Sequence, residues 1–169
     1  DYEEEVKLAI LMSGEYISNN FLGQGIKVDF YVLKGIITSL LEYLGYDKRI
    51  RFNVLKDMKD LHPGKSAEIV IDNETIGFMG RVNPNVLKDD VYVLEISLDK
   101  LSKKKTGKLK FEDISKYPDI TKDVAFIVDK KVLSSEIEKE IRKNGTKILN
   151  EVKVFDLYEG EKVPEGKRS

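Results

Sequence analysis

The chain has 169 residues, 41% hydrophobic and 35% charged, which is enough for one well-buried domain or two small ones. Its formal net charge of -1 argues against a uniformly basic nucleic-acid-binding protein, although local stretches can still be basic. It has no cysteine, which excludes disulfides and thiolate metal sites, and no apolar run approaches the roughly 20 residues of a membrane span.

The start of the chain, Asp1-Tyr2-Glu3-Glu4-Glu5, is the opposite of the basic beginning of a signal peptide. The chain also lacks an initial methionine. We therefore expect a piece cut from a longer protein, with no membrane association, and the absence of cysteine fits a cytoplasmic location.

The first predicted elements are a strand and a long helix. Residues 6–14 form a short apolar run that ends at Ser13-Gly14, which predicts a buried strand. In the helix that follows, Asp29 is suited to be the N-cap and Gly45 occupies the position of a C-terminal cap. Its apolar residues recur at steps of three and four: Phe30, Leu33, Ile37, Leu40, Leu41 and Leu44.

From Ile50 onward the apolar period changes to two, which predicts strands. Residues 49–55 alternate, and residues 66–71 place Ala67, Ile69 and Ile71 on one face. The following "DNET" predicts a turn, and residues 76–82 return as the second arm of a hairpin. Residues 90–101 predict one more strand. Residues 1–101 therefore read as a mostly antiparallel sheet backed by a helix.

A lysine-rich stretch, "SKKKTGKLK" at residues 102–110, has one glycine and no apolar periodicity. Such composition is typical of a solvated linker, so we place the boundary between two domains, 1–101 and 111–169, here. The functional alternative is a patch of cations that contacts phosphates.

Beyond the linker the pattern predicts a strand, a helix and a second long strand, at residues 123–129, 133–145 and 148–160. Within the helix, Ser135 and Glu138 have capping-box spacing, Ile137 and Ile141 share one face, and Gly145 ends it. This order is half of a ferredoxin-like βαββαβ unit, so we expect an incomplete domain that holds only the N-terminal half.

The triplet Gly64-Lys65-Ser66 is similar to the end of a phosphate-binding loop. Such a loop needs an earlier glycine at position 59, which is Lys59, and a helix directly after the triplet. An alternating strand follows instead. We predict a turn at Pro63-Gly64 that leads into this strand, and no nucleotide site.

No catalytic or metal site is predicted. His62 is the only histidine and has neither a second histidine nor a carboxylate cluster at ligand spacing, so it reads as structural. Carboxylates are too common in this chain for spacing alone to identify a pair for acid–base chemistry.

An aromatic pair on the last predicted strand has two possible roles. Alternation places Phe155 and Leu157 on one face and Asp156 and Tyr158 on the other. We assign Phe155 to the core beneath the helix. Tyr158 is either a half-buried strand residue or an exposed ring that stacks an RNA base, as on other ferredoxin-like sheets.

Two pairs of segments resemble the beta subunit of bacterial phenylalanyl-tRNA synthetases, near its C-terminus. The first pair is "LHPGKSAEI", with His62, Pro63 and Gly64, and "IGFMGRVNP", where Asn83 replaces a histidine common in the family. The second pair is "YPDITKDVAFIVD" and "VKVFDLYEGEKVPEGKRS". Its matching positions include Pro118, Asp123, Phe155, Asp156 and Gly160.

The resemblance, which covers nearly the whole chain, implies an α+β protein. Its first part would be a class II synthetase-like antiparallel sheet without aminoacylation residues, which packs against the catalytic alpha subunit of an α2β2 enzyme. Its second part would be a ferredoxin-fold anticodon-binding domain that contacts the anticodon stem-loop of tRNA(Phe). The candidate contacts there are Lys122, Tyr158, Lys167 and Arg168.

For the whole enzyme, the resemblance implies a cytoplasmic phenylalanine–tRNA ligase of protein biosynthesis that uses ATP and magnesium, with no cofactor held by this part. A different class of function stays open, namely a protein-interaction module whose ferredoxin-like half binds no RNA. Salt-dependent RNA binding discriminates between the two, since phosphate contacts weaken steeply with ionic strength.

Overall fold

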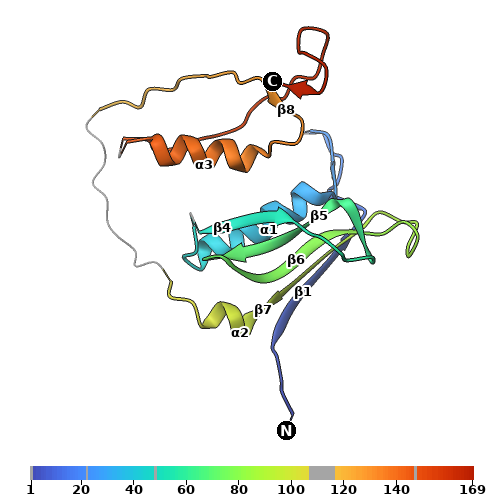
Figure 1. The fold of residues 1–169 in the computed structure, drawn as a ribbon. Helices are drawn as coiled ribbons and strands as arrows, with labels where there is room; N and C mark the ends of the chain where they lie inside the picture. Colours follow the sequence, from blue (N-terminus) through green and yellow to red (C-terminus); the bar gives the residue numbers. More distant parts are fainter. Residues whose placement is uncertain (1, 22, 48, 107–116, 147) are drawn as a thin grey trace. The chain divides into compact units, whose positions relative to one another are not determined.

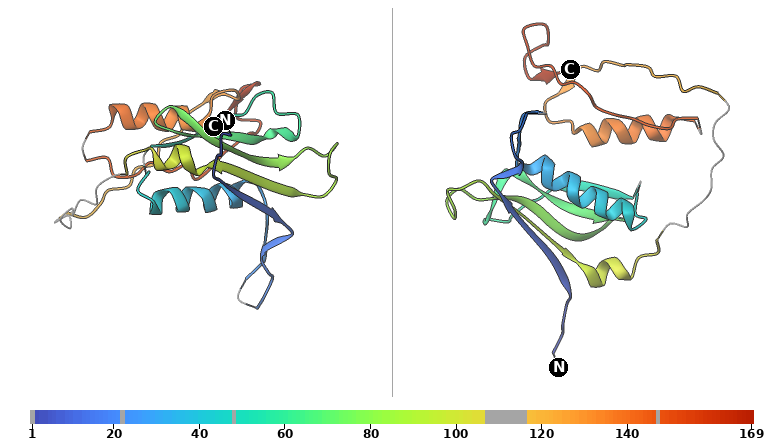
Figure 2. Two further views of the ribbon diagram at one scale, coloured as in Figure 1. Left: turned by 90° about the horizontal axis from the view of Figure 1, so that it is seen from below. Right: turned by 180° about the vertical axis from the view of Figure 1, so that it is seen from behind.

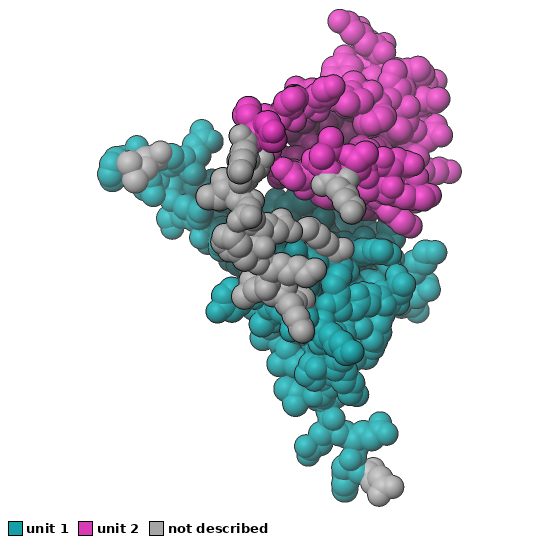
Figure 3. Space-filling model, turned by 90° about the vertical axis from the view of Figure 1, so that its left-hand side faces the viewer, with its two compact units in different colours: residues 1–112 teal, residues 113–169 magenta. Residues whose placement is uncertain are grey.

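A computed structural model describes all residues except 1, 22, 48, 107–116 and 147. It divides the chain into two compact units, unit 1 at residues 1–112 and unit 2 at residues 113–169 (Figure 3). The second half of the predicted linker, residues 107–110, lies outside the described residues. The domain limits at 101 and 111 stay predictions.

Unit 1 is built on a five-stranded antiparallel sheet with the order β1-β7-β6-β5-β4 (Figure 1). The predicted mostly antiparallel sheet is therefore confirmed. A separate small ladder joins β2 and β3. The strands are β1 (Lys7–Ser13), β2 (Glu15–Ile17), β3 (Ile26–Lys27), β4 (Ile50–Val54), β5 (Leu61–Ile71), β6 (Glu74–Val82) and β7 (Val91–Ser97).

The long helix α1 (Phe30–Tyr43) lies along one face of this sheet (Figure 2). Asp29 is its N-cap, since the Asp29 carboxylate accepts a hydrogen bond of 2.7 Å from the Val32 N–H. Gly45, just past the end, has a φ of 86°, the left-handed conformation that glycine adopts without steric cost. The predicted helix and both of its ends are confirmed.

The core of unit 1 lies between α1 and the sheet. Leu33, Ile37 and Leu41 of α1 are fully buried, and the predicted inward face of β5 is confirmed because Ala67, Ile69 and Ile71 are buried too. Burial of such side chains is the main favourable contribution to folding. The other buried members of the cluster are Val28, Tyr46, Ile76, Met79, Tyr92, Leu94, Ile96 and Leu101.

The hairpin between β5 and β6 forms where it was predicted, with a tighter turn. Its two turn residues, Asp72 and Asn73, have φ values of 52° and 66°. Positive φ at both positions is the geometry of a type I′ turn, whose twist matches that of the two strands. Aspartate and asparagine tolerate this conformation better than other side chains.

Three expectations for unit 1 are wrong in detail. The first strand is not buried: β1 is an edge strand, and Leu11 is 71% exposed because it points away from the covered face. The predicted turn at Pro63-Gly64 is instead a register shift inside β5. The predicted strand at 90–101 ends at Ser97, which caps the short helix α2 (Leu98–Ser102) by accepting from the Lys100 N–H.

Unit 2 contains the predicted helix and little of the predicted strands. The helix is α3 (Ser134–Asn144), and a short ladder pairs β8 (Val128–Asp129) with β9 (Lys167–Arg168). The expected strand at 123–129 shrinks to its last two residues, and no strand is assigned to residues 148–160. No described residue of unit 2 is buried, so these segments lack the apolar face that stabilises a strand.

The N-terminal end of α3 differs from the prediction, whereas its C-terminal end agrees with it. The capping-box position belongs to Glu136 rather than Glu138, since the Glu136 carboxylate accepts from the Leu133 N–H at 2.9 Å. Gly145 ends the helix as predicted, since it is the C-cap and its N–H donates to the Ile141 carbonyl at 2.7 Å; its φ of -67° shows that it does so without the left-handed conformation. Ile137 and Ile141 share a half-buried face as predicted.

Candidate nucleic-acid interface

Three of the four candidate RNA-contacting residues come together near the end of unit 2. The Tyr158 N–H donates to the Ser169 carbonyl at 2.8 Å, and the Ser169 N–H donates back to the Tyr158 carbonyl at 3.0 Å. Lys167 and Arg168 directly precede Ser169 and form β9. The fourth candidate, Lys122, is exposed in a segment without regular structure, and no described contact joins it to the others.

Tyr158 packs closely on Gly160. Tyr158 is 45% exposed as a residue, and a Cβ atom added to Gly160 would lie 2.3 Å from the Tyr158 hydroxyl oxygen. Glycine at position 160 therefore leaves the space that the ring occupies. A half-exposed ring on a short backbone pairing retains enough free surface to contact a base.

The two neighbouring cations, Lys167 and Arg168, have different surroundings. The Arg168 guanidinium donates to the Val132 carbonyl, and Arg168 is half-buried, so part of its hydrogen-bonding capacity is used within unit 2. Lys167 is exposed, and only its backbone takes part in described bonds. Lys167 is therefore the better placed of the two for phosphate contacts.

A nearby ion pair was not foreseen from the sequence. Lys130, just after β8, places its Nζ atom 2.8 Å from the Glu159 carboxylate. The hydrogen bond and the positive charge of Lys130 lower the pKa of Glu159, with a smaller contribution from the charge of Arg168. The adjacent lysines Lys130-Lys131 after a predicted strand were the signal available in the sequence. Glu159 offsets part of this positive charge.

The remaining motif positions of unit 2 do not form a core. Phe155 is 69% exposed, so its assignment to a core beneath the helix is wrong for the described residues. The two-face alternation is absent because the segment is not a strand, and the Asp156 carboxylate instead accepts from the Leu157 N–H at 2.8 Å. Pro118 and Asp123 lie exposed in irregular chain.

Comparison with known families covers most of the chain in two parts. The model of the phenylalanyl tRNA synthetase beta chain CLM domain matches residues 1–98. The model of the ferredoxin-fold anticodon binding domain matches residues 115–169. The chain belongs to the phenylalanyl-tRNA synthetase beta-chain family. The predicted α+β fold class, with its ferredoxin-fold second part, is confirmed as well.

Individual relatives agree with this family. The phenylalanine–tRNA ligase beta subunits of Shouchella clausii and Bacillus subtilis are each 39% identical to the chain over 98% of its length. That of Bacillus cereus (strain ZK / E33L) is 36% identical over 99% of it. The match covers 21% of each relative, so the chain spans about a fifth of the length of these synthetase subunits.

Within the part that matches the synthetase CLM domain, the Gly64-Lys65-Ser66 triplet lies inside β5 and is followed by strand rather than by a helix. This geometry does not provide the backbone cradle of a phosphate loop. His62 has a local role: its Nδ1 atom accepts from the Gly64 N–H at 3.0 Å. Asn83 joins the end of β6 to the loop before β5, because its side-chain amide donates to the Lys59 carbonyl at 2.8 Å.

Among the described residues no group of three or more His, Asp or Glu side chains is arranged to hold a metal ion. Within the same residues no helix combines the length and apolarity that crossing a bilayer requires.

Proposed function

We propose that the chain is a non-catalytic part of a phenylalanine–tRNA ligase beta subunit in which unit 2 contacts the anticodon stem-loop of tRNA(Phe). One observation carries the proposal: the CLM domain model and the anticodon-binding domain model match the same chain, in that order. The relatives of highest identity given above carry the same name over nearly the whole chain.

Unit 1 would act as a scaffold for the catalytic alpha subunit in an α2β2 enzyme. Support comes from the local roles of the residues that first suggested chemistry. His62 accepts a bond from its neighbour Gly64, and the apparent phosphate triplet belongs to a paired strand. ATP and magnesium would then be used by the complete enzyme rather than held by this part. We place the enzyme in the cytoplasm, where protein synthesis takes place.

In unit 2, the arrangement supports two kinds of RNA contact. The half-exposed Tyr158 ring can stack a base, an interaction typically worth about 1–3 kcal/mol. The exposed ammonium groups of Lys167 and Lys122 can neutralise phosphates. Both contacts suit an unpaired loop, in which bases are splayed and the backbone is accessible.

The test is a tRNA(Phe) titration of the complete heterotetramer at two salt concentrations. Tyr158→Ala should weaken binding by about tenfold at both salts, because stacking is independent of salt. The pair Lys122→Gln and Lys167→Gln should weaken binding mainly at low salt and flatten the salt dependence. Lys88→Gln, an exposed lysine of unit 1, is the matched control.

Wild-type affinity in all of these variants would overturn the RNA contact. The second candidate function, a protein-interaction module, would then be favoured, because unit 2 exposes large apolar side chains. Phe155 and Leu157, which precede Tyr158 by three residues and one residue, are 69% and 58% exposed. A patch of this kind is typical of a surface that another protein covers.

A further inference from the structure

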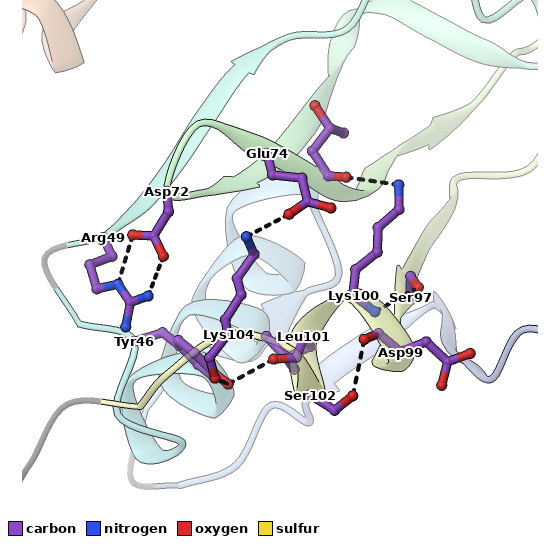
Figure 4. Close-up of polar contacts among 11 residues, drawn as sticks. Tyr46, Arg49, Asp72, Glu74, Ser97, Asp99, Lys100, Leu101, Ser102 and Lys104 are labelled. Atoms are coloured by element: carbon purple, nitrogen blue, oxygen red, sulfur yellow. Dashed lines mark hydrogen bonds and ion pairs between the residues drawn. The ribbon is translucent and has the colours of Figure 1, made fainter.

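The first part of the predicted linker is held against unit 1 by a set of polar contacts (Figure 4). We define the connector as residues 101–105. Tyr46 and Arg49, which follow α1, donate to its backbone, and Glu74 of the β5–β6 hairpin accepts from Lys104. Asp72, in the turn of the same hairpin, acts indirectly by holding Arg49. These four residues are named the connector clamp.

Tyr46 anchors the beginning of the connector. The residue is buried, and its hydroxyl donates to the Leu101 carbonyl at 3.0 Å. Leu101 is itself buried in the core cluster. Since a buried hydroxyl without a partner is costly, this bond favours one position of the chain at the end of α2.

Arg49 binds the other end of the connector. Its Nε and Nη2 atoms donate to the two carboxylate oxygens of Asp72, and its Nη1 atom donates to the Lys105 carbonyl. The guanidinium also lies 5.4 Å from the centre of the Tyr46 ring. The planar fork of arginine can make all of these contacts at once, whereas a lysine could not. The Arg49 hydrogen bonds lower the pKa of Asp72.

Lys104 completes the attachment. Its Nζ atom is 2.8 Å from the Glu74 carboxylate, and its side chain is only 9% exposed. The interpretation of the lysine-rich stretch as solvated is therefore wrong for Lys104. The Glu74 side chain is 52% exposed, so the pair is covered on the lysine side only.

We propose that the connector clamp is a positioning device that fixes the direction in which the chain leaves unit 1 toward the anticodon-binding part. Without the clamp, the last residue held against unit 1 would be Leu101 in the core. With the clamp, it is Lys105. Fewer residues then separate the last held residue from the following domain, which restricts where that domain can reach and raises its effective concentration near a ligand held by the rest of the enzyme. The consequence for tRNA rests on the proposed function; the clamp itself does not.

The clamp is tested in the chain of residues 1–169 by backbone amide exchange of residues 103–106 and by trypsin cleavage after Lys103, Lys104 and Lys105. Arg49→Met should speed both by about tenfold, since charge-assisted bonds are lost while global unfolding is not needed. Cleavage after Lys122 in unit 2 is the internal standard. Asp72→Asn, which keeps a side chain suited to the turn, should give a smaller change of the same kind.

The matched control is Arg51→Met. Arg51 is an exposed arginine of β4 that contacts Asn73, the other residue of the same turn, and it makes no described contact with the connector. If Arg51→Met opened residues 103–106 as much as Arg49→Met, or if neither opened them, the clamp would be rejected. Equal thermal midpoints of the variants would exclude a general loss of folding.

The consequence is tested separately in the complete heterotetramer. Arg49→Met should weaken tRNA(Phe) binding by about threefold to tenfold, while Arg51→Met leaves it unchanged. Only Arg49→Met releases the connector from unit 1, so that the following domain meets its ligand less often. An opened connector with unchanged tRNA affinity would overturn the positioning role. Failure of the wild-type enzyme to bind tRNA through unit 2 would instead defeat the proposed function, and the exchange experiment would still decide on the clamp.

Discussion

Among the described residues, units 1 and 2 each contain one helix of more than ten residues with apolar residues at helical spacing, but only α1 has a buried face. In α1 the inward residues Leu33, Ile37 and Leu41 are inaccessible to solvent. In α3 the corresponding Ile137 and Ile141 are half-buried, and no residue of that helix is buried. The difference is the five-stranded sheet that faces α1, since most helix stability in proteins comes from packing of this kind.

The strands show the same contrast. β1 pairs with β7 along its entire length, whereas β8 and β9 pair over only two residues each. Residues 123–129 and 148–160 are rich in strand-forming side chains, yet Val124, Ile127 and Val154 are exposed. Strand propensity measures fit to a half-buried surface, so it is realised only where neighbouring strands and a packed face exist.

The largest expected effect comes from removing a buried leucine of α1. Leu41→Ala should destabilise unit 1 by about 2–5 kcal/mol, because it loses apolar burial and leaves a cavity. The matched change in unit 2, Ile141→Ala, should cost much less, since that side chain is half-buried. Urea unfolding followed by amide exchange measures both units in one chain. Equal costs would contradict the contrast between the two helices.

A smaller effect is expected where a glycine lets two strands approach each other. A Cβ at Gly77 of β6 would lie 2.0 Å from the Glu95 carbonyl oxygen and 2.7 Å from the Ile96 Cα atom of β7. Backbone atoms cannot move away without opening the ladder, so Gly77→Ala should destabilise unit 1 by about 1–3 kcal/mol.

The control for Gly77→Ala is Gly160→Ala in unit 2. The atoms in the way there belong to the Tyr158 side chain, which can rotate. We therefore expect Gly160→Ala to change the exposure of the Tyr158 ring and leave the exchange of unit 2 amides nearly unchanged. Fluorescence quenching of tyrosine and amide exchange read the two effects separately.

The sequence was most informative where a local pattern coincided with a packed neighbour. The ends of α1, its inward face and the β5–β6 hairpin follow from Asp29, Gly45 and the alternation at Ala67, Ile69 and Ile71. In unit 2 the same kind of alternation misplaced Phe155, because no strand formed to give the residue an inner face.

The candidate site and the clamp show what patterns cannot reveal. Lys167 and Arg168 were identified from charge and from family resemblance, but the bond from Arg168 to the Val132 carbonyl depends on long-range geometry. The contact from Arg49 to the Lys105 carbonyl joins residues more than fifty positions apart. A run of lysines gives no sign of which member is covered, and only the structure distinguishes Lys104.

A modest stabilisation is expected from filling an exposed glycine in α1. Gly35 lies in the helix interior, and a Cβ added there would meet nothing within 4 Å. Because glycine loses more backbone entropy than alanine on folding, Gly35→Ala should stabilise unit 1 by about 0.5–1 kcal/mol. A higher urea midpoint with an unchanged slope would agree. A lower midpoint would show that the exposed face of α1 does not tolerate a methyl group.

The smallest expected effect separates the ion pairs of the two units by their pH dependence. Hydrogen bonds from Arg49 and Lys104 lower the pKa of Asp72 and of Glu74 from their ordinary values of 3.8 and 4.5. The folded state therefore binds a proton at each of these carboxyls less readily than the unfolded state does. The stabilisation is complete when the pH is above the ordinary pKa values, and it is lost as the pH falls through the lowered pKa values of the folded state.

The double variant Asp72→Asn with Glu74→Gln should therefore lose less stability than the wild type between about pH 7 and about pH 3. Glu159→Gln removes the carboxyl of unit 2 whose pKa is lowered by Lys130, a lysine that is about half exposed. This change should leave the pH dependence of unit 1 unchanged. Urea midpoints at the two pH values measure the difference. If the double variant followed the wild-type profile, the clamp carboxylates would contribute no more than the exposed pair, because solvent would screen both equally.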